Sequence, residues 1–281
     1  MDISTDINSF LDDLINNFYS SEKFTYHSTA PFTNVCFYLI FKRNNFKNVF
    51  YYYEDEDNVK YLNSVIIYHK SFEPLDYFID HILNSDSKTC FSSIIYIDSV
   101  IRHEFLVVYD RDSNTLQFLD PNHESIFGSY NPYGEICEYM SSRINGLKYI
   151  KTEDLYGTDF SQEEKMKLDF NTLSCYLSKS SGYCASWTIL FADLITYYQN
   201  ITPLDIIQIL YERNKDKTLI ETKRDLSKII VSYILSIYEE MKDEYSKNGI
   251  SLDLESFEDY QEQYVYSDKK MYDIICGYFD N

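Results

Sequence analysis

The sequence predicts an α+β fold: a mixed or antiparallel central sheet packed on a buried helix that carries a cysteine, with a helical C-terminal third. Two observations lead to this prediction. β-prone runs rich in Tyr, Phe, Val and Ile gather in the middle of the chain, and from Cys184 onward the apolar spacing is almost wholly helical. We divide the chain into a core, residues 1–200, and a helical C-terminal extension packed on it, residues 201–281.

The first third of the chain predicts helices at both ends and strands between them. Residues 5–18, TDINSFLDDLINNF, have helical apolar spacing after a capping residue. The runs NVCFYLIFK (34–42) and NVFYYYE (48–54) are β-prone and flanked by Asn or charged residues, so we expect strands. Residues 73–85, EPLDYFIDHILNS, predict a helix with Pro74 in its first turn.

The middle of the chain predicts three consecutive strands and a small α/β unit. The strands are CFSSIIYIDS (90–99), HEFLVVYD (103–110) and NTLQFLD (114–120). A short helix follows in GEICEYMSSRI (134–144), and GLKYIKT (146–152) predicts one more strand.

The C-terminal third predicts helices throughout. The periodic segments are 185–199, 203–214 beginning at Pro203, a long one near 219–246, and a final one at about 252–278. The Asn- and Asp-rich connections between segments are typical of turns.

The net charge of −20, from 45 acidic and 25 basic residues, restricts the classes of molecule that the protein is expected to bind. Nucleic acid and anionic membrane surfaces both require clustered Lys and Arg, so we expect neither as a partner. The run KIIVSYILSIY (228–238) is about half as long as a membrane-spanning helix needs to be. The N-terminus has no basic region typical of a signal peptide. We therefore expect a soluble, intracellular protein.

The six cysteines are scattered and form no CxxC pair. In an intracellular protein they should be reduced thiols. Only the loose pair Cys175 and Cys184 approaches the spacing of metal ligands, so we expect no metal and no cofactor.

Residues 103–123, HEFLVVYDRDSNTLQFLDPNH, predict an antiparallel hairpin. The polar residues at 110–114 are a strong turn signal between the two β-prone runs. A turn centred near Asp112 would place His103 opposite about residue 121.

This hairpin brings a possible acid–base pair together. Asp120 and Asn122 would close one strand beside His103, which opens the other. Side chains on adjacent strands lie about 5 Å apart directly and about 7–8 Å apart diagonally, so an imidazole and a carboxylate can meet. The carboxylate of Asp120 would fix the tautomer of the ring and stabilise its protonated form, and Asn122 is the alternative orienting residue.

Cys184 lies where a small polar stretch, KSSG (179–182), turns into a helix. Gly182 permits a sharp turn before that helix. The first turn of a helix offers free N–H groups and the positive end of the dipole, which favour a thiolate and could bind an oxyanion. We expect Trp187 to pack in the core beneath this cysteine.

Three pieces occur in a fixed order: His103, FLD (118–120) and GYCASW (182–187). This series resembles the Ulp1/adenain-like (clan CE) cysteine proteases, in forms seen in large DNA viruses. The resemblance covers residues 94–198, about a third of the chain. In that family a His at a strand start, an Asp or Glu on the next strand and a Cys at the N-terminus of a buried helix form a triad. The resemblance implies that His103 is the general base, Asp120 its orienting residue and Cys184 the nucleophile.

Two positions depart from the family pattern. Glu104 follows the histidine where the family usually carries a Trp, and we expect this carboxylate to border the substrate route and to disfavour acidic residues beside the cleaved bond. Residues 175–181, CYLSKSS, contain no Gln, the family's usual oxyanion donor. The candidates for oxyanion binding or support are Ser178, Ser181, Gly182 and Trp187.

A papain-like order of residues is the alternative within the protease class. Cys36 or Cys90 would then be the nucleophile and Asn122 the orienting residue. Cys36 lies in a run predicted to be a strand, and Cys90 has no Gly turn before it, so both are poorly presented.

The resemblance implies a thiol protease that cleaves protein tails after small residues. The substrate would be a ubiquitin-like modifier or a viral precursor with an extended Gly-containing tail. The acidic net charge of the chain is compatible with a basic substrate. Host cytoplasm and virus particle both stay open as locations. Two other functions also stay open: an acyltransferase with the same triad, and a catalytically inactive protein-binding module of the same fold.

Overall fold

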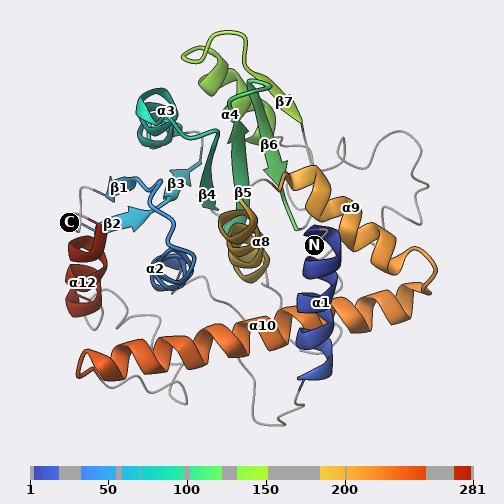
Figure 1. Cartoon of the computed structure of the whole chain (residues 1–281). Coiled ribbons are helices and arrows are strands. Elements are labelled where there is room, and N and C mark those ends of the chain that lie inside the picture. The colour runs from blue at the N-terminus through green and yellow to red at the C-terminus, as the bar shows by residue number, and fades with distance from the viewer. Residues whose placement is uncertain are drawn as a thin grey trace.

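The structure is a computed structural model of the whole chain, coloured from the N-terminus to the C-terminus in Figure 1. The residues that it describes are 3–18, 33–54, 59–69, 71–97, 102–121, 132–150, 184–199, 201–250 and 269–279.

A five-stranded mixed sheet with strand order β3-β4-β5-β6-β7 forms the centre of the molecule. The three middle strands pair antiparallel: β4 (Thr89–Ile97), β5 (Arg102–Asp110) and β6 (Thr115–Leu119). The edge strands β3 (Ser64–Tyr68) and β7 (Lys148–Ile150) each add in parallel. The predicted α+β class and the mixed sheet are therefore confirmed, as are the three consecutive strands.

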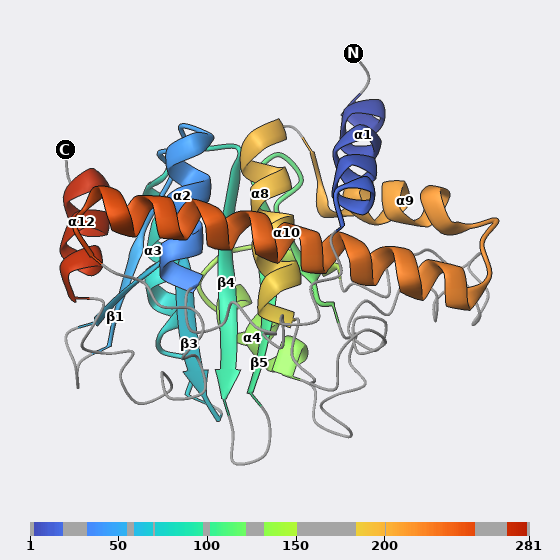
Figure 2. The same ribbon diagram turned by 90° about the horizontal axis from the view of Figure 1, so that it is seen from below.

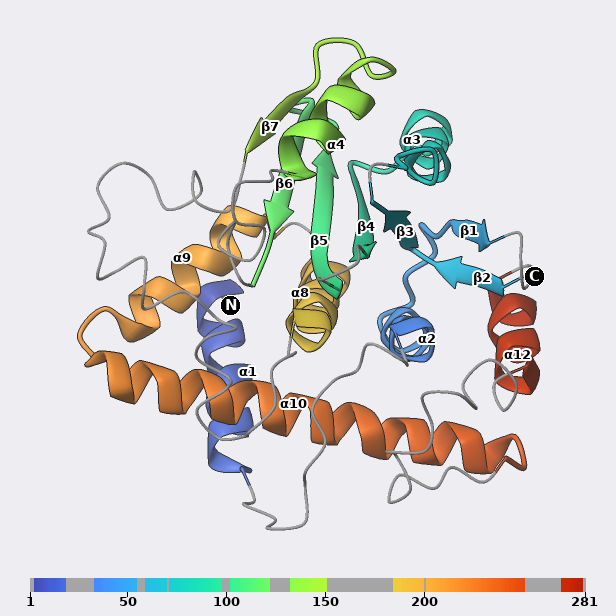
Figure 3. The ribbon, with the colours of Figure 1, turned by 180° about the vertical axis from the view of Figure 1, so that it is seen from behind.

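Helices cross over at both parallel edges of the sheet, because a parallel pair cannot be joined by a tight hairpin. Helix α3 (Leu75–Asn84) connects β3 to β4, and α4 (Pro132–Ser141) connects β6 to β7. Both helices pack their apolar residues against one face of the sheet. Figure 3 shows them on the side away from the remaining helices. Both helices were predicted, and Pro74 is the N-cap of α3.

The opposite face of the sheet is covered by α8 (Cys184–Tyr198) and α2 (Thr33–Arg43), as Figure 1 shows. Every residue of α8 from Ala185 to Thr196 is buried. A helix that is apolar on all sides is stable only when neighbours surround it, and α8 has the sheet on one side and other helices around it. The cysteine-bearing helix is thus the central helix of the fold.

The prediction of a strand at residues 34–42 is wrong, because this run lies in α2. All residues from Val35 to Phe41 are buried, between the sheet, α8 and the C-terminal helices. A helix enclosed on all sides has no polar face, so its sequence lacks the 3.6-residue period and its Val, Phe, Tyr and Ile resemble a strand.

The predicted strand at residues 48–54 is confirmed in its second half. β1 (Tyr51–Glu54) pairs antiparallel with β2 (Val59–Leu62) in a separate two-stranded sheet. Our sequence analysis did not predict β2 or β3.

The C-terminal helices are α9 (Pro203–Asn214), α10 (Leu219–Lys247) and α12 (Lys269–Phe279). Capping boxes start α9 at Thr202 and α10 at Thr218. Seen from below, α10 runs across α2 and α8 and past α1 (Ile3–Asn16), as in Figure 2. Its buried residues belong to the same apolar cluster as those of α2 and α8. The first part of the predicted segment 252–278 lies outside the described residues.

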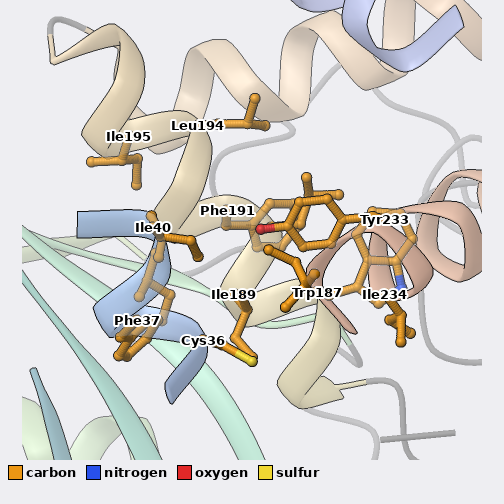
Figure 4. Packing of buried hydrophobic residues seen from close by; sticks show 14 of the residues in the cluster. Cys36, Phe37, Ile40, Trp187, Ile189, Phe191, Leu194, Ile195, Tyr233 and Ile234 are labelled. Carbon is orange, nitrogen blue, oxygen red and sulfur yellow. The ribbon is translucent and has the colours of Figure 1, made fainter. Parts of the chain in front are cut away.

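A polar network also joins α2, α8 and α10. Arg43 forms ion pairs with Asp193 of α8 and Glu240 of α10. The same Asp193 carboxylate accepts hydrogen bonds from Tyr233 at 3.1 Å and from Asn44 at 3.0 Å. Tyr233 also packs among the apolar side chains labelled in Figure 4. The network therefore ties the cysteine-bearing helix to its two helical neighbours.

Among the described residues, no helix combines the length and the apolar character that crossing a bilayer requires.

Candidate active site

The β5–β6 hairpin determines how His103 meets Asp120. Leu106 pairs with Leu119 and Asp110 with Thr115, through a turn in which Asn114 has a φ of +51°. Extended outward, this register places Asp120 opposite Phe105, two residues from His103.

The sequence had predicted a register one residue different, with His103 facing residue 121. Alternate residues of a strand point to opposite faces, so a shift of one residue changes which side chains share a face. In the observed register Asp120 lies diagonally across from His103 on the same face of the hairpin, within reach of a long side chain.

The two side chains form a buried pair. Nε2 of His103 lies 2.8 Å from Oδ1 of Asp120, and the side chains are 1% and 2% exposed. Desolvated charges of opposite sign attract strongly, so the pair holds the ring in one orientation.

Asp120 has a second hydrogen-bond partner, which our sequence analysis missed. The hydroxyl of Tyr133, near the start of α4, donates to Oδ2 of Asp120. Tyr133 is buried beside Phe105 and Phe118, with ring centroids 5.1 Å and 5.2 Å away. No spacing rule connects Tyr133 with the hairpin, because α4 reaches Asp120 only through the tertiary packing.

Cys184 is the first residue of α8 and is half-buried. Its side chain lies close enough to the ring of His103 to raise the pKa of that ring. Because Asp120 occupies Nε2, the ring nitrogen left for the sulfur is Nδ1. Cys184 lies at the positive end of the α8 dipole. The three residues that the sequence singled out as a triad therefore lie together.

The surroundings of His103 favour its protonated form. Burial alone would lower the pKa of His103, but the charge of Asp120, its hydrogen bond to the ring and the contact with Cys184 outweigh burial. The pKa of His103 rises to about 10, so the ring is an imidazolium at neutral pH.

Glu104 lies on the face of β5 opposite to His103. Its side chain is 2% exposed and accepts a hydrogen bond from Ser93 at 2.7 Å and from Thr33, the first residue of α2, at 3.4 Å. Consecutive residues of β5 point to opposite faces of the sheet, so Glu104 points toward α2 when His103 points toward Asp120. The expectation that Glu104 borders the substrate route stays a prediction, which the burial of this carboxylate does not favour.

Trp187 is fully buried, as predicted, and packs against Phe191 at a centroid distance of 5.7 Å (Figure 4). It belongs to the apolar cluster one turn after Cys184.

The other candidates lie outside the described residues. These are Ser178, Ser181 and Gly182 for oxyanion binding, and Asn122 as the alternative orienting residue. Their roles stay predictions.

The cysteines of the papain-like alternative are fully buried and away from His103. Cys36 lies in α2 with its sulfur 4.0 Å from that of Met241, and Cys90 lies in β4 beside Asn48. Across the described residues, no group of three or more His, Cys, Asp or Glu side chains is placed to hold a metal ion.

Comparisons of the chain with protein families, with curated proteins and with solved structures found no match.

Proposed function

We propose that the protein is a cysteine-type peptidase in which Cys184 is the nucleophile, His103 the general acid and base, and Asp120 the residue that orients His103. The observation that carries the proposal is the buried His103–Asp120 pair, with Nε2 2.8 Å from Oδ1, beside a Cys184 side chain that raises the pKa of the same ring. The resemblance of the ordered residues to the Ulp1/adenain-like proteases supports the same assignment. A nucleophile, a base and an orienting group in mutual contact are the parts that acyl transfer through a thiol requires.

In the first half of the reaction, the sulfur anion of Cys184 attacks the carbonyl carbon of the scissile amide. The carbonyl electron pair moves to oxygen and forms a tetrahedral oxyanion. When the carbonyl reforms, the C–N bond breaks, and the His103 imidazolium gives its Nδ1 proton to the departing nitrogen. The products are a free amine, a thioester on Cys184 and a neutral His103.

In the second half, a water molecule attacks the thioester carbonyl and His103 takes the proton that the water loses. The second tetrahedral oxyanion collapses, the C–S bond breaks, and the sulfur departs as an anion. The carboxylic acid product leaves, and the imidazolium faces a thiolate again, ready for another substrate. Asp120 keeps its negative charge throughout and stabilises each imidazolium that forms.

The N-terminus of α8 can stabilise the oxyanion. Backbone N–H groups in the first turn of a helix have no partner within the helix, and the helix dipole adds to their attraction for an anion. Cys184 is the first residue of a 15-residue helix, so its own amide and the next one are the candidates.

For the substrate, we propose a protein with an extended, Gly-containing tail, such as a ubiquitin-like modifier or a viral precursor, cut after a small residue. The support comes from the sequence resemblance. The net charge of −20 favours basic residues around the cleavage site through long-range attraction, which salt would weaken.

The test is a peptide library with Gly at the cleaved position and varied neighbours, analysed by mass spectrometry at low and high salt. We expect cleavage after Gly by the unaltered protein and none by Cys184→Ala or His103→Ala. Cleavage that persists in Cys184→Ala would contradict the proposal. A reactive thiol that cleaves no Gly peptide and no ubiquitin-like tail would favour the acyltransferase, and an unreactive thiol would favour a binding module.

A further inference from the structure

The Asp120 carboxylate is held from both of its oxygens. Oδ1 faces Nε2 of His103 at 2.8 Å, and Oδ2 accepts the hydrogen bond of the Tyr133 hydroxyl. An ionised carboxylate is only an acceptor, so the direction of both bonds is settled: the ring and the phenol each donate. All three side chains are at most 2% exposed.

A carboxylate held by one hydrogen bond can still rotate about its Cβ–Cγ bond, because this torsion is broad. A second bond at the other oxygen fixes the plane of the group. The plane of the Asp120 carboxylate in turn determines where Oδ1 lies for its hydrogen bond with Nε2. The position of Oδ1 therefore determines how the His103 ring is oriented and where its Nδ1 points.

We propose that Tyr133 is a positioning residue for His103: its hydroxyl fixes the Asp120 carboxylate so that Oδ1 is presented to Nε2. This inference deepens the proposed function and rests on it for its catalytic consequence. In the proposed reaction Tyr133 has no part in bond making or proton transfer, and its role runs through its hydrogen bond to Asp120.

The packing of Tyr133 suits it to this task. Its ring packs against both Phe105 of β5 and Phe118 of β6, which adjoin His103 and Asp120 along their strands on the same face of the sheet. The phenol is therefore anchored by the two strands whose side chains it orients. Because the anchoring is apolar, Tyr133→Phe removes the hydrogen bond and keeps these ring contacts.

Helix α4 supplies a matched control. Tyr139 lies on the same helix and donates its hydroxyl to another carboxylate, that of Asp76 in α3, at 3.0 Å. Tyr139→Phe removes the same atom from the same helix and breaks a tyrosine–carboxylate bond, together with the bond that this hydroxyl accepts from Arg143, and it leaves the Tyr133–Asp120 bond in place.

The experiment compares the unaltered protein, Tyr133→Phe and Tyr139→Phe by nuclear magnetic resonance, following the Nε2–H proton of His103. A proton held between an imidazolium and a buried carboxylate exchanges slowly with water and gives a far-downfield resonance. We expect this resonance in the unaltered protein and in Tyr139→Phe, and we expect Tyr133→Phe to lose it or to broaden it severely. Circular dichroism establishes that each variant is folded.

A second measurement separates this inference from the proposed function. We expect alkylation of Cys184 by iodoacetamide near neutral pH to slow about tenfold in Tyr133→Phe, the loss typical of one hydrogen bond to a charged group, and not in Tyr139→Phe. If the resonance is retained in Tyr133→Phe, or is absent from the unaltered protein, the role of Tyr133 is overturned even if Cys184 proves reactive. If the resonance behaves as expected but Cys184 is no more reactive than an ordinary thiol, Tyr133 positions His103 and the peptidase proposal fails instead.

Discussion

His103 and Glu104 are neighbours in the chain and are both buried, but their side chains lie on opposite faces of β5. His103 contacts Asp120 and Cys184, whereas Glu104 is bound by Ser93 and by Thr33 at the start of α2. One strand thus supplies a reactive group to one face and a structural carboxylate to the other. This division determines what substitutions at the two positions should do.

We expect Glu104→Gln to leave the charge preference of the proposed cleavage unchanged, because Glu104 is buried and already hydrogen-bonded to Ser93 and Thr33. The measurement is the ratio of kcat/KM for two Gly peptides that carry Lys or Glu next to the cleaved bond. The ratio should be the same in the variant and in the unaltered protein. A shift of the variant toward the Glu peptide would mean that Glu104 does reach the substrate.

Cys184 should be the most reactive cysteine of the described part of the chain. Cys36, Cys90, Cys137 and Cys276 are buried, whereas Cys184 is half-buried and contacts His103. Labelling with iodoacetamide near pH 7, followed by peptide mass spectrometry, compares the sites directly.

Exposure alone could make Cys184 react first, so the contribution of His103 needs its own variant. We expect His103→Ala to slow the labelling of Cys184 at least about tenfold, because the sulfur loses the neighbouring His103 side chain that would activate it. An unchanged rate in His103→Ala would leave only accessibility as the explanation.

The stability of the protein should depend on pH through His103. Its pKa is raised to about 10 in the folded state, against about 6.5 in an unfolded chain. The stabilisation is therefore complete below about pH 6.5 and is lost as the pH rises through about 10. Between pH 7 and pH 10, the free energy of unfolding should fall more steeply for the unaltered protein than for Asp120→Asn. Urea unfolding across this range measures both curves, and parallel curves would contradict the prediction.

The same pKa predicts the basic limb of the activity profile. In the proposed reaction His103 is protonated when it releases the leaving amine, so kcat/KM should fall as the pH passes through about 10. In Asp120→Asn the imidazolium loses its charged partner, and this limb should move to lower pH. A limb that stays in place would argue that Asp120 does not act on His103.

Removing Asp193 should destabilise the protein by about 3 kcal/mol, because Arg43 and Tyr233 would lose a buried acceptor. Urea unfolding of Asp193→Ala measures the loss. Tyr233→Phe removes a single hydrogen bond and should cost about 1 kcal/mol.

An exposed ion pair provides the control for Asp193. Lys88 and Asp112 lie 2.6 Å apart, but their side chains are 64% and 65% exposed. Water screens such a pair, so Lys88→Ala should change the free energy of unfolding by less than about 1 kcal/mol. If Asp193→Ala and Lys88→Ala lower the free energy of unfolding equally, the polar network between α2, α8 and α10 stabilises the protein no more than an exposed ion pair does.

Local patterns in the sequence determined much of this protein. The turn signal at residues 110–114 predicts the hairpin, and the change from KSSG to an apolar periodic segment predicts a helix that begins at Cys184. Pro203 predicts where helix α9 starts. These features depend on residues close to one another in the chain, so their physical causes can be read without the fold.

Only the tertiary structure decided the fold of residues 34–42, the face on which Glu104 lies and the partner of Oδ2 of Asp120. The first run is a helix because sheet and helices enclose it on all sides, which removes the polar face that marks a helix in a sequence. A register shift of one residue placed Asp120 on the same face as His103. Tyr133 meets Asp120 because α4 crosses over to pack on that face. Each of these outcomes depends on contacts between distant segments, and such contacts form only when the whole apolar core packs together.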